Sequence, residues 1–273
     1  MSFKYQPICQ NLHTHTTYCD GKDTIEEMIL VACEKGFHSI GFSSHSFRCG
    51  QLMPQEVLQA YKQEIAVMKK KYANKIDIYC GLEYEMSIPT ECSGCDYLIG
   101  ALHCLELGDD LVSIDRSLQD LQTVIEKYFH GDGMACAKAY YQHLAGLSEY
   151  GNFDFIAHFD LITKYSEQVQ LFDCQAKEYQ WAAIEAAEQL AGKIPFFEVN
   201  TGAMSRGYRT SPYPDMFLLK ELKRLGFGAI ISTDCHDSRF LDYGYQEAVG
   251  VLKACGFKEQ FILTKDGFIP IEL

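Results

Sequence analysis

Short runs of apolar residues alternate along this chain with longer stretches in which apolar residues recur at helical spacing. The runs are rich in Ile, Val and Phe, as buried strands are. They cover residues 7–13, 39–45, 76–83, 97–103, 153–159, 194–200 and 228–234. Strands that alternate with helices predict βαβ units and a parallel sheet. The simplest closure of seven parallel strands is a barrel one unit short of the common eight.

The stretches between these runs carry start and stop signals for helices. Thr24 and Glu27 have the spacing of a capping box, and Gly36 follows the helix that they begin. Pro54 suits the first turn of a second helix that reaches Tyr72. Further helices are predicted at about 118–128, 134–149, 175–191, 214–225 and 242–254. No repeat, low-complexity segment or Pro-rich linker divides the chain, so we expect residues 1–273 to form one α/β domain.

Composition narrows the choice of partners. Of the 273 residues, 47% are hydrophobic, which is enough for a large core and argues against disorder. The net charge of -13 disfavours nucleic acid and anionic membranes, because phosphate contacts need clustered Lys and Arg. An acidic chain is compatible with bound divalent cations. No apolar run approaches the ~18 residues that span a bilayer.

The twelve cysteines indicate reduced thiols rather than a disulfide framework. The chain is not small, and its opening MSFKYQPICQ has no apolar signal segment, so we predict a cytoplasmic protein. Cys92 and Cys95 form a lone CxxC pair, with Cys80 and Cys104 at a distance. Structural zinc sites usually use two tight pairs, so we do not assign one here.

Histidines and carboxylates gather where the predicted strands end. Six of the nine histidines follow a strand, and three acidic residues join them: His13, His15, Asp20, His45, Glu83, His103, His158, Asp234 and His236. Each alone could merely cap a helix or bond to a carbonyl, as we assume for His38, His130 and His143. In a parallel barrel, however, the carboxyl ends of all strands converge on the face where active sites lie. We therefore expect the nine side chains to meet in one pocket.

The types of side chain predict a metal cluster. Imidazole and carboxylate are ligands of Zn²⁺, Mn²⁺ and Fe²⁺, and nine ligands are too many for one ion. His13 and His15 alternate in an extended segment, so they point to the same side and suit one ion. Clustered ions lower the pKa of a bridging water and clamp the oxygens of a phosphoryl group.

Six separated motifs, in order along nearly the whole chain, resemble the polymerase and histidinol phosphatase (PHP) superfamily. They are NLHTHTTYCDG, SSH, GLEYE, ALH, AHFD and STDCH. YCDG, GLEYE and HFDLITKY look like the histidinol-phosphatase branch rather than the polymerase-linked exonucleases. The resemblance implies a distorted (β/α)7 TIM-like barrel that holds three divalent ions.

The resemblance also distributes the ligands. The first ion would be held by His13, His15, Glu83 and Asp234, and the second by Glu83, His103 and His158. The third would be held by Asp20, His45 and His236. Some relatives have a histidine in place of Asp20, and the harder carboxylate could favour Mn²⁺ or Fe²⁺ over Zn²⁺. We assign the direct catalytic part to Asp20, His45, Glu83 and Asp234.

The function expected from this resemblance is hydrolysis of a small phosphate ester, L-histidinol phosphate, in histidine biosynthesis. A metal-bridging hydroxide would attack phosphorus without a covalent phosphoenzyme. The loop NTGAMSRGYRTSPYP offers Arg206 and Arg209 to the phosphate, with Lys164 as a weaker candidate. Asp160 and Glu85 could bind the amine or imidazole of the substrate, or could instead orient ligand histidines.

Three other functions are compatible with parts of this sequence. A PHP phosphoesterase that acts on a small nucleotide is one alternative. The acidity of the chain argues against a long polynucleotide as its substrate. An amidohydrolase-type barrel typically needs a Lys or carboxylate where this chain has His103. A non-catalytic metal-binding module should have lost some of the nine ligand positions, which are all filled.

Overall fold

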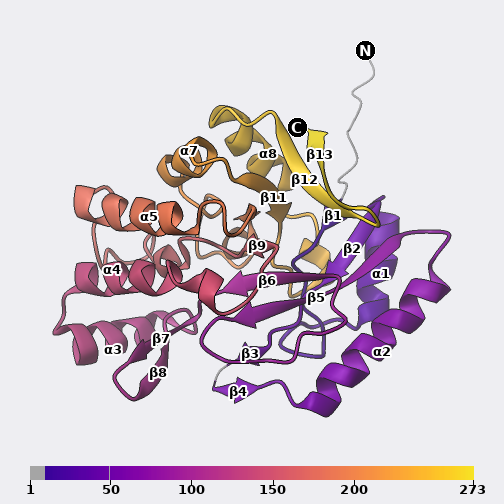
Figure 1. The fold of residues 1–273 in the computed structure, drawn as a ribbon, viewed down its shortest axis with the longest axis horizontal. Coiled ribbons are helices and arrows are strands. Elements are labelled where there is room, and N and C mark those ends of the chain that lie inside the picture. The colour runs from indigo at the N-terminus through magenta and orange to yellow at the C-terminus, as the bar shows by residue number, and fades with distance from the viewer. Residues whose placement is uncertain (1–9, 49) are drawn as a thin grey trace.

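A computed structural model describes residues 10–48 and 50–273, so the first three residues of the predicted strand 7–13 lie outside the described part. Seven parallel strands form the central sheet, and they are neighbours in chain order (Figure 1). They are β1 (Gln10–Asn11), β2 (Ser39–Phe42), β5 (Asp77–Glu85), β6 (Tyr97–Ala101), β9 (Phe155–Ile156), β10 (Phe196–Asn200) and β11 (Gly228–Ser232). Every predicted run thus contains a strand, and the predicted α/β barrel is confirmed.

The first and last strands come together just beyond their ends. Thr14 and Cys235 form a parallel bridge. The amide of His15 donates to the carbonyl of Cys235 at 2.8 Å, and the amide of Cys235 donates to the carbonyl of His13 at 3.1 Å. These bonds nearly close the sheet into a distorted barrel. They also fix the segments that carry His13 and His15 against the segment that carries Asp234 and His236.

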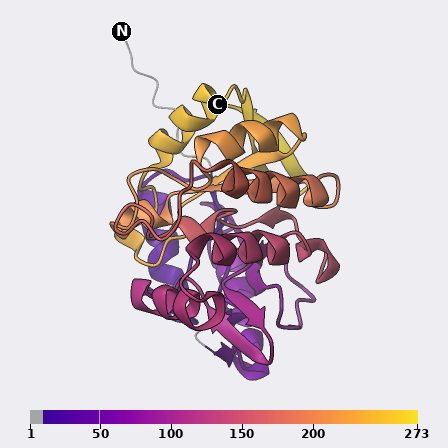
Figure 2. The ribbon, with the colours of Figure 1, turned by 90° about the vertical axis from the view of Figure 1, so that its left-hand side faces the viewer.

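Helices surround this sheet, as two perpendicular views show (Figures 1 and 2). Those of nine or more residues are α1 (Ile25–Glu34), α2 (Gln55–Lys71), α3 (Leu118–Phe129), α4 (Gly133–Leu144), α5 (Lys177–Leu190), α7 (Met216–Arg224) and α8 (Tyr245–Ala254), and the short α6 is Gly202–Ser205. The predicted capping box is present, since the amide of Thr24 donates to Glu27 Oε2 at 2.8 Å. The helix predicted to reach residue 149 ends at Leu144, and a 3₁₀ turn, Leu147–Glu149, follows Gly146.

Three hairpins were not predicted. They are β3 (Phe47–Arg48) with β4 (Gln51–Leu52), β7 (Cys104–Leu107) with β8 (Asp110–Ser113), and β12 (Glu259–Thr264) with β13 (Gly267–Glu272). The first two directly follow His45 and His103, so they stand beside the predicted site. The third lies at the opposite end of the barrel, where the Gln10 side chain donates to the Leu263 carbonyl at 2.8 Å and accepts from its amide at 2.7 Å.

Large side chains fill the barrel interior. The buried side chain of Tyr97 lies against Gly41 and Gly81, where an added Cβ would stand 2.4 Å from its hydroxyl oxygen and 2.2 Å from its Cζ, respectively. Its hydroxyl donates to the carbonyl of Phe42 at 3.2 Å. Around it pack Leu12, Tyr79, Ile99, Ala101, Phe155, Ala157, Ile230 and Leu263. The barrel interior is therefore a packed core and not a pore.

Among the described residues, the free thiols include Cys19, Cys33, Cys80, Cys92, Cys95, Cys136, Cys174, Cys235 and Cys255. Within the same residues, no helix has the length and apolar character needed to cross a membrane.

Candidate metal centre

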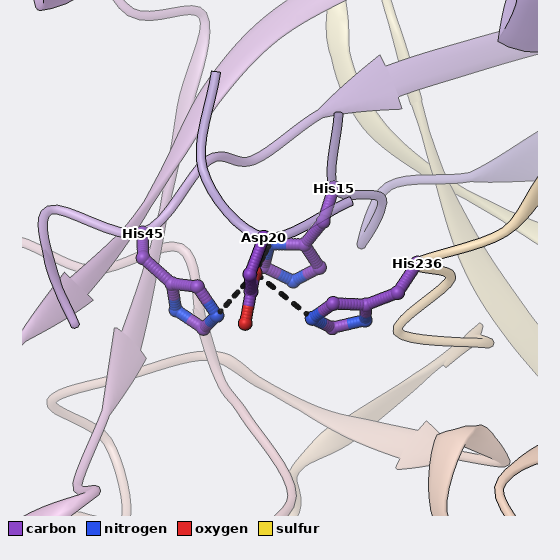
Figure 3. Close-up of side chains that lie close together, drawn as sticks. All are labelled: His15, Asp20, His45 and His236. Carbon is purple, nitrogen blue, oxygen red and sulfur yellow. Dashed lines mark ion pairs between the residues drawn. The ribbon is translucent and has the colours of Figure 1, made fainter. Parts of the chain in front are cut away.

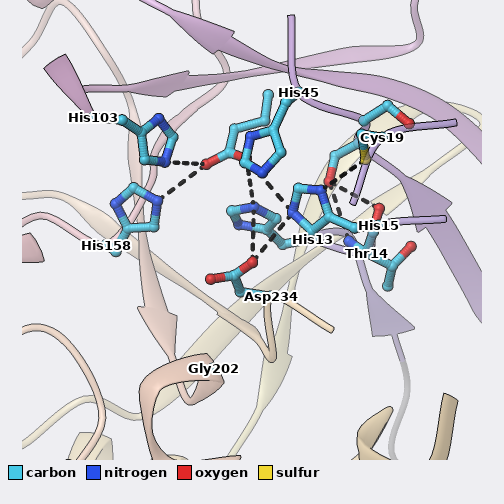
Figure 4. A network of polar contacts seen from close by, with 12 residues as sticks. His13, Thr14, His15, Cys19, His45, His103, His158, Gly202 and Asp234 are labelled. Carbon is cyan, nitrogen blue, oxygen red and sulfur yellow. Dashed lines mark hydrogen bonds and ion pairs between the residues drawn. The ribbon is translucent and has the colours of Figure 1, made fainter. Parts of the chain in front are cut away.

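The nine predicted ligand side chains converge at the carboxyl end of the barrel. Six of them are labelled in Figure 4: His13, His15, His45, His103, His158 and Asp234. Seven of the nine follow a strand of the sheet, whereas Glu83 lies within β5, two residues before its end, and Asp20 lies in the loop before α1. Six of them are histidines whose rings stand beside one another, with His15 stacked between His45 and His236 at centroid distances of 4.3 and 4.1 Å. The strand ends thus bring nine residues that are far apart in the sequence, from His13 to His236, into one cluster.

Glu83 stands at the centre of this cluster. Its Oε2 lies 3.3 Å from His13 Nε2, 3.5 Å from His15 Nε2 and 2.7 Å from His45 Nδ1. Its Oε1 lies 3.2 Å from His103 Nε2 and 3.0 Å from His158 Nε2. Although burial alone would raise the pKa of Glu83, the surrounding histidines hold it well below its usual range. Glu83 is therefore an ionised carboxylate that can bridge two groups of histidines.

Asp234 supplies a second buried carboxylate. Its Oδ1 lies 3.2 Å from His15 Nε2, 3.4 Å from His236 Nδ1 and 3.7 Å from His13 Nε2. The backbone of Asp234 is left-handed, with φ of 46°, a conformation that costs free energy in a residue other than glycine and is concentrated at functional sites. A Cβ at Gly202 would stand 2.8 Å from the Cβ of Asp234. Glycine at 202 therefore leaves room for this carboxylate.

Asp20 forms the outer edge of the cluster (Figure 3). Its Oδ1 lies 3.2 Å from His236 Nε2, 3.4 Å from His45 Nε2 and 4.0 Å from His15 Nδ1. The side chain is 36% exposed, whereas that of Glu83 is 1% exposed. This part of the cluster therefore faces the solvent side.

The cluster has the properties of a site for divalent cations. Donor atoms in three groups lie within 4.8 Å of one another: His15, Asp20, His45 and His236; His13, His15 and Asp234; and His45, Glu83 and His103. Six buried side-chain atoms of the cluster, among them Glu83 Oε2 and both ring nitrogens of His45, have no hydrogen-bond partner. Buried polar atoms without partners are costly, and bound cations would satisfy them. The residues therefore fit a multinuclear metal centre.

These groups largely follow the three ligand sets implied by the resemblance. The first and third sets correspond to two groups, with His15 within reach of both. In the remaining group His45 stands with Glu83 and His103, while the expected His158 approaches Glu83 Oε1 from the other side.

Two glutamates orient histidine rings of the cluster through hydrogen bonds to Nδ1 of His13 and of His103. Glu198, in β10, accepts from His13 Nδ1 at 2.6 Å and from the amide of His158 at 2.9 Å. Glu85 accepts from His103 Nδ1 at 2.9 Å and from the amide of His103. Glu85 was predicted, with this orienting role as one alternative. Glu198 was missed, although a charged residue inside the apolar run IPFFEVN was a usable signal.

Replacing Glu198 by Gln should weaken the centre without removing a ligand. The amide can still accept a hydrogen bond, but it no longer favours the His13 tautomer that presents Nε2 to the cluster. Loss of such an orienting partner typically costs about 10- to 100-fold in metal affinity or activity. Titration of the metal-free variant with Mn²⁺ or Zn²⁺ measures this. Glu188→Gln, on the outer surface of α5, is the matched control and should bind as the unchanged protein does.

A cavity of about 180 Å³ opens over the cluster, and its rim is basic. Besides ligand side chains it is lined by Arg48, Asp115, Arg116, Leu161, Lys164, Arg206 and Tyr208. Arg206, as predicted for a site residue, lines the cavity, and its guanidinium donates to Asp234 Oδ2 at 2.8 Å. Arg48 was missed. It donates to Asp20 Oδ2 at 3.1 Å and to Asp115 Oδ2 at 3.2 Å.

Two of the predicted substrate-binding residues face elsewhere. Asp160 and Arg209 line a second cavity of about 320 Å³, together with Thr163 and Asp215. Arg209 donates to the carbonyl of Thr163 at 3.4 Å, and Asp160 accepts from the amide of Asp215 at 2.9 Å. The structure therefore separates these two side chains from Arg206 and Lys164.

The model of the PHP domain family matches residues 11–202, which is more than half of the chain. The chain belongs to the PHP domain family. This agrees with the metal-ligating geometry and with the resemblance of the six motifs. The match ends before Asp234 and His236, whose place in the cluster comes from the structure.

Among curated proteins, the chain is 24% identical to one of Schizosaccharomyces pombe named as a probable histidinol-phosphatase, with 95% of this chain and 90% of that protein covered. It is also 24% identical to the histidinol-phosphatase of Bacillus subtilis, with 86% and 96% covered. A solved structure of histidinol phosphate phosphatase from Lactococcus lactis, complexed with zinc, L-histidinol and phosphate, superposes with a TM-score of 0.75 at 21% identity. The superposition covers 96% of this chain and 98% of the Lactococcus lactis chain.

Proposed function

We propose that this protein is a metal-dependent phosphatase that hydrolyses L-histidinol phosphate to L-histidinol and phosphate, in cytoplasmic histidine biosynthesis. The observation that carries the proposal is the cluster of six histidines and three carboxylates beneath a cavity with a basic rim. The named relatives along nearly the whole chain support this substrate.

The proposal includes three divalent ions, held by the nine residues in the sets given above. When bound, such ions lower the pKa of water toward neutrality and offset negative charge on phosphate oxygens. The chain itself supplies ionised Glu83 and Asp234 as ligands. It also holds the His13 and His103 rings through Glu198 and Glu85, so that Nε2 of each faces the cluster.

The basic rim is the place where we propose that the phosphate binds. Arg48, Arg116, Lys164 and Arg206 all line the cavity, although the chain has a net charge of -13. A phosphate dianion is attracted to such a local concentration of positive charge, and a guanidinium can match two of its oxygens. Of the five substrate contacts predicted from sequence, we retain Arg206 and Lys164, and we assign Glu85 to orienting His103.

Replacing Arg206 by Ala should raise KM for the phosphate ester by about 10- to 100-fold, the range for one lost charged hydrogen bond. Because Arg206 also holds Asp234 and lies 3.2 Å from His236 Nδ1, we expect weaker metal retention in the same variant. Steady-state kinetics at saturating metal separates these effects. Arg224→Ala removes an arginine from the surface of α7 and serves as the control. An unchanged KM would remove Arg206 from the phosphate site.

Phosphate release is the direct test of the proposed function. Metal-reconstituted protein would be assayed with L-histidinol phosphate, a nucleoside monophosphate and a simple alkyl phosphate. Preference for histidinol phosphate is expected. Faster release from the nucleotide would favour a PHP nucleotide phosphatase, and no release from any ester would leave only a non-catalytic metal-binding module.

A further inference from the structure

Hydrolysis of an alkyl phosphate leaves an alkoxide, a strong base that departs poorly unless it receives a proton as the bond breaks. The need for a proton donor rests on the proposed function, and few side chains in the cavity can meet it. Apart from ligand side chains, the cavity is lined by Arg48, Asp115, Arg116, Leu161, Lys164, Arg206 and Tyr208. The proton donor should be among these residues, because it must reach the ester oxygen.

Most of these residues cannot give a proton. Arginine stays protonated at any pH relevant to proteins, and leucine has no proton to give. Asp115 is ionised: burial alone would raise its pKa, but Lys164, Arg48 and nearby histidines hold it well below its usual range. Two candidates remain, Lys164 and Tyr208.

The position of Lys164 suits a proton donor. Its side chain is 9% exposed, and its Nζ donates to the Asp115 carbonyl at 2.6 Å and to Asp115 Oδ2 at 3.3 Å. An ammonium has three N–H bonds, so these two contacts fix its direction and leave a third N–H. The Tyr165 and Tyr208 rings flank Nζ, with centroids at 5.6 and 5.2 Å. Tyr208 thus helps to position the ammonium.

The surroundings of Lys164, burial above all, favour release of its proton. Burial lowers its pKa from the ordinary value of 10.5, and the positive charges of Arg206 and Arg48 lower it further. Asp115 and Asp234 act in the opposite direction, but the net shift is downward. A general acid works best when its pKa lies closer to the working pH.

We propose that Lys164 is the general acid that protonates the leaving oxygen of the phosphate ester. The oxygen of the attacking hydroxide forms a bond to phosphorus, and the P–O bond to the alkyl group breaks with its electron pair on the leaving oxygen. That oxygen takes a proton from Lys164 Nζ, which gives the free alcohol, inorganic phosphate and a neutral lysine. The proton that water lost in forming the hydroxide is returned from solvent to Nζ.

The test exchanges Lys164 for Arg, which keeps the positive charge but cannot donate a proton. Metal-loaded Lys164→Arg would be compared with the unchanged protein on L-histidinol phosphate and on 4-nitrophenyl phosphate, whose leaving group needs no acid. General acid catalysis contributes about 10²- to 10⁴-fold, so kcat for the alkyl ester should fall by at least about 100-fold. The aryl ester should be affected far less. Lys138→Arg, on the surface of α4, is the matched control.

A pH profile supplies the second measurement. With the alkyl ester, kcat of the unchanged protein should fall at high pH as Lys164 loses its proton, and this basic limb should be absent in Lys164→Arg. Equal losses on both esters, no loss on either, or a basic limb that persists would each overturn the proposal. So would a larger, alkyl-specific loss in Tyr208→Phe. If the unchanged protein releases phosphate from no ester, the proposed function itself has failed, which is a different result.

Discussion

Glu83→Gln should lose bound metal and turnover together, with kcat reduced by about 10³-fold or more. Glu83 is the one carboxylate within 3.5 Å of five histidine nitrogens in the described part of the chain, so its charge serves both halves of the cluster. Metal ions contribute several kcal/mol to stabilising charge in such reactions, and each 1.36 kcal/mol is a factor of ten in rate. Elemental analysis and steady-state kinetics on the same sample measure both losses.

Asp77→Asn is the matched control for this variant. Asp77 lies at the opposite end of the same strand, β5, and is exposed. The control should keep its metal and its rate. A Glu83→Gln protein with full metal content and unchanged kcat would show that Glu83 is not a ligand. The proposed metal site would then be contradicted, because Glu83 is its central carboxylate.

Removal of the metal should also destabilise the fold. Without cations, the buried carboxylates of Glu83 and Asp234 and the unpartnered histidine nitrogens remain beside one another. A ligand present at 1,000 times its Kd stabilises the folded state by about 4.1 kcal/mol per site, and each kcal/mol shifts Tm by about 2–4 °C in a chain of 150–250 residues. We therefore expect a strong chelator to lower Tm by about 10 °C or more.

Calorimetry with and without chelator measures this shift, and added Mn²⁺ or Zn²⁺ should restore Tm and phosphatase activity together. Ca²⁺, which prefers oxygen ligands, is the control cation and should restore neither. A Tm that does not change on chelation, in protein shown to be metal-free, would contradict the metal centre.

The barrel and the clustering of the polar side chains could both be predicted from the sequence, because both follow from one rule. Apolar runs mark the strands, and side chains that follow parallel strands meet at one end, so His13 and Asp234 could be brought together without any contact information. The hairpins were missed because their strands are short and fall outside the βα alternation. Turn signals were present at Gly108-Asp109 and Asp266-Gly267, and Arg48 was missed along with its hairpin.

The neighbours of Lys164 show where sequence proximity misled. Asp160 and Lys164 lie in the same motif, but a 3₁₀ helix, Leu161–Thr163, runs between them. Residues three apart share one side of a 3₁₀ helix. Leu161 and Lys164 therefore face the metal cavity, whereas Asp160 and Thr163 face the second one. A single turn of helix thus determines which of these side chains line the cavity over the cluster.

The bridge between Thr14 and Cys235 has a consequence for how the protein is made. Because synthesis runs from the amino end, a chain emerging from the ribosome presents His13 and His15 well before Asp234 and His236. The nine side chains can therefore gather only after His236 has been synthesised, so a product truncated before that residue should not bind the full set of ions that we propose.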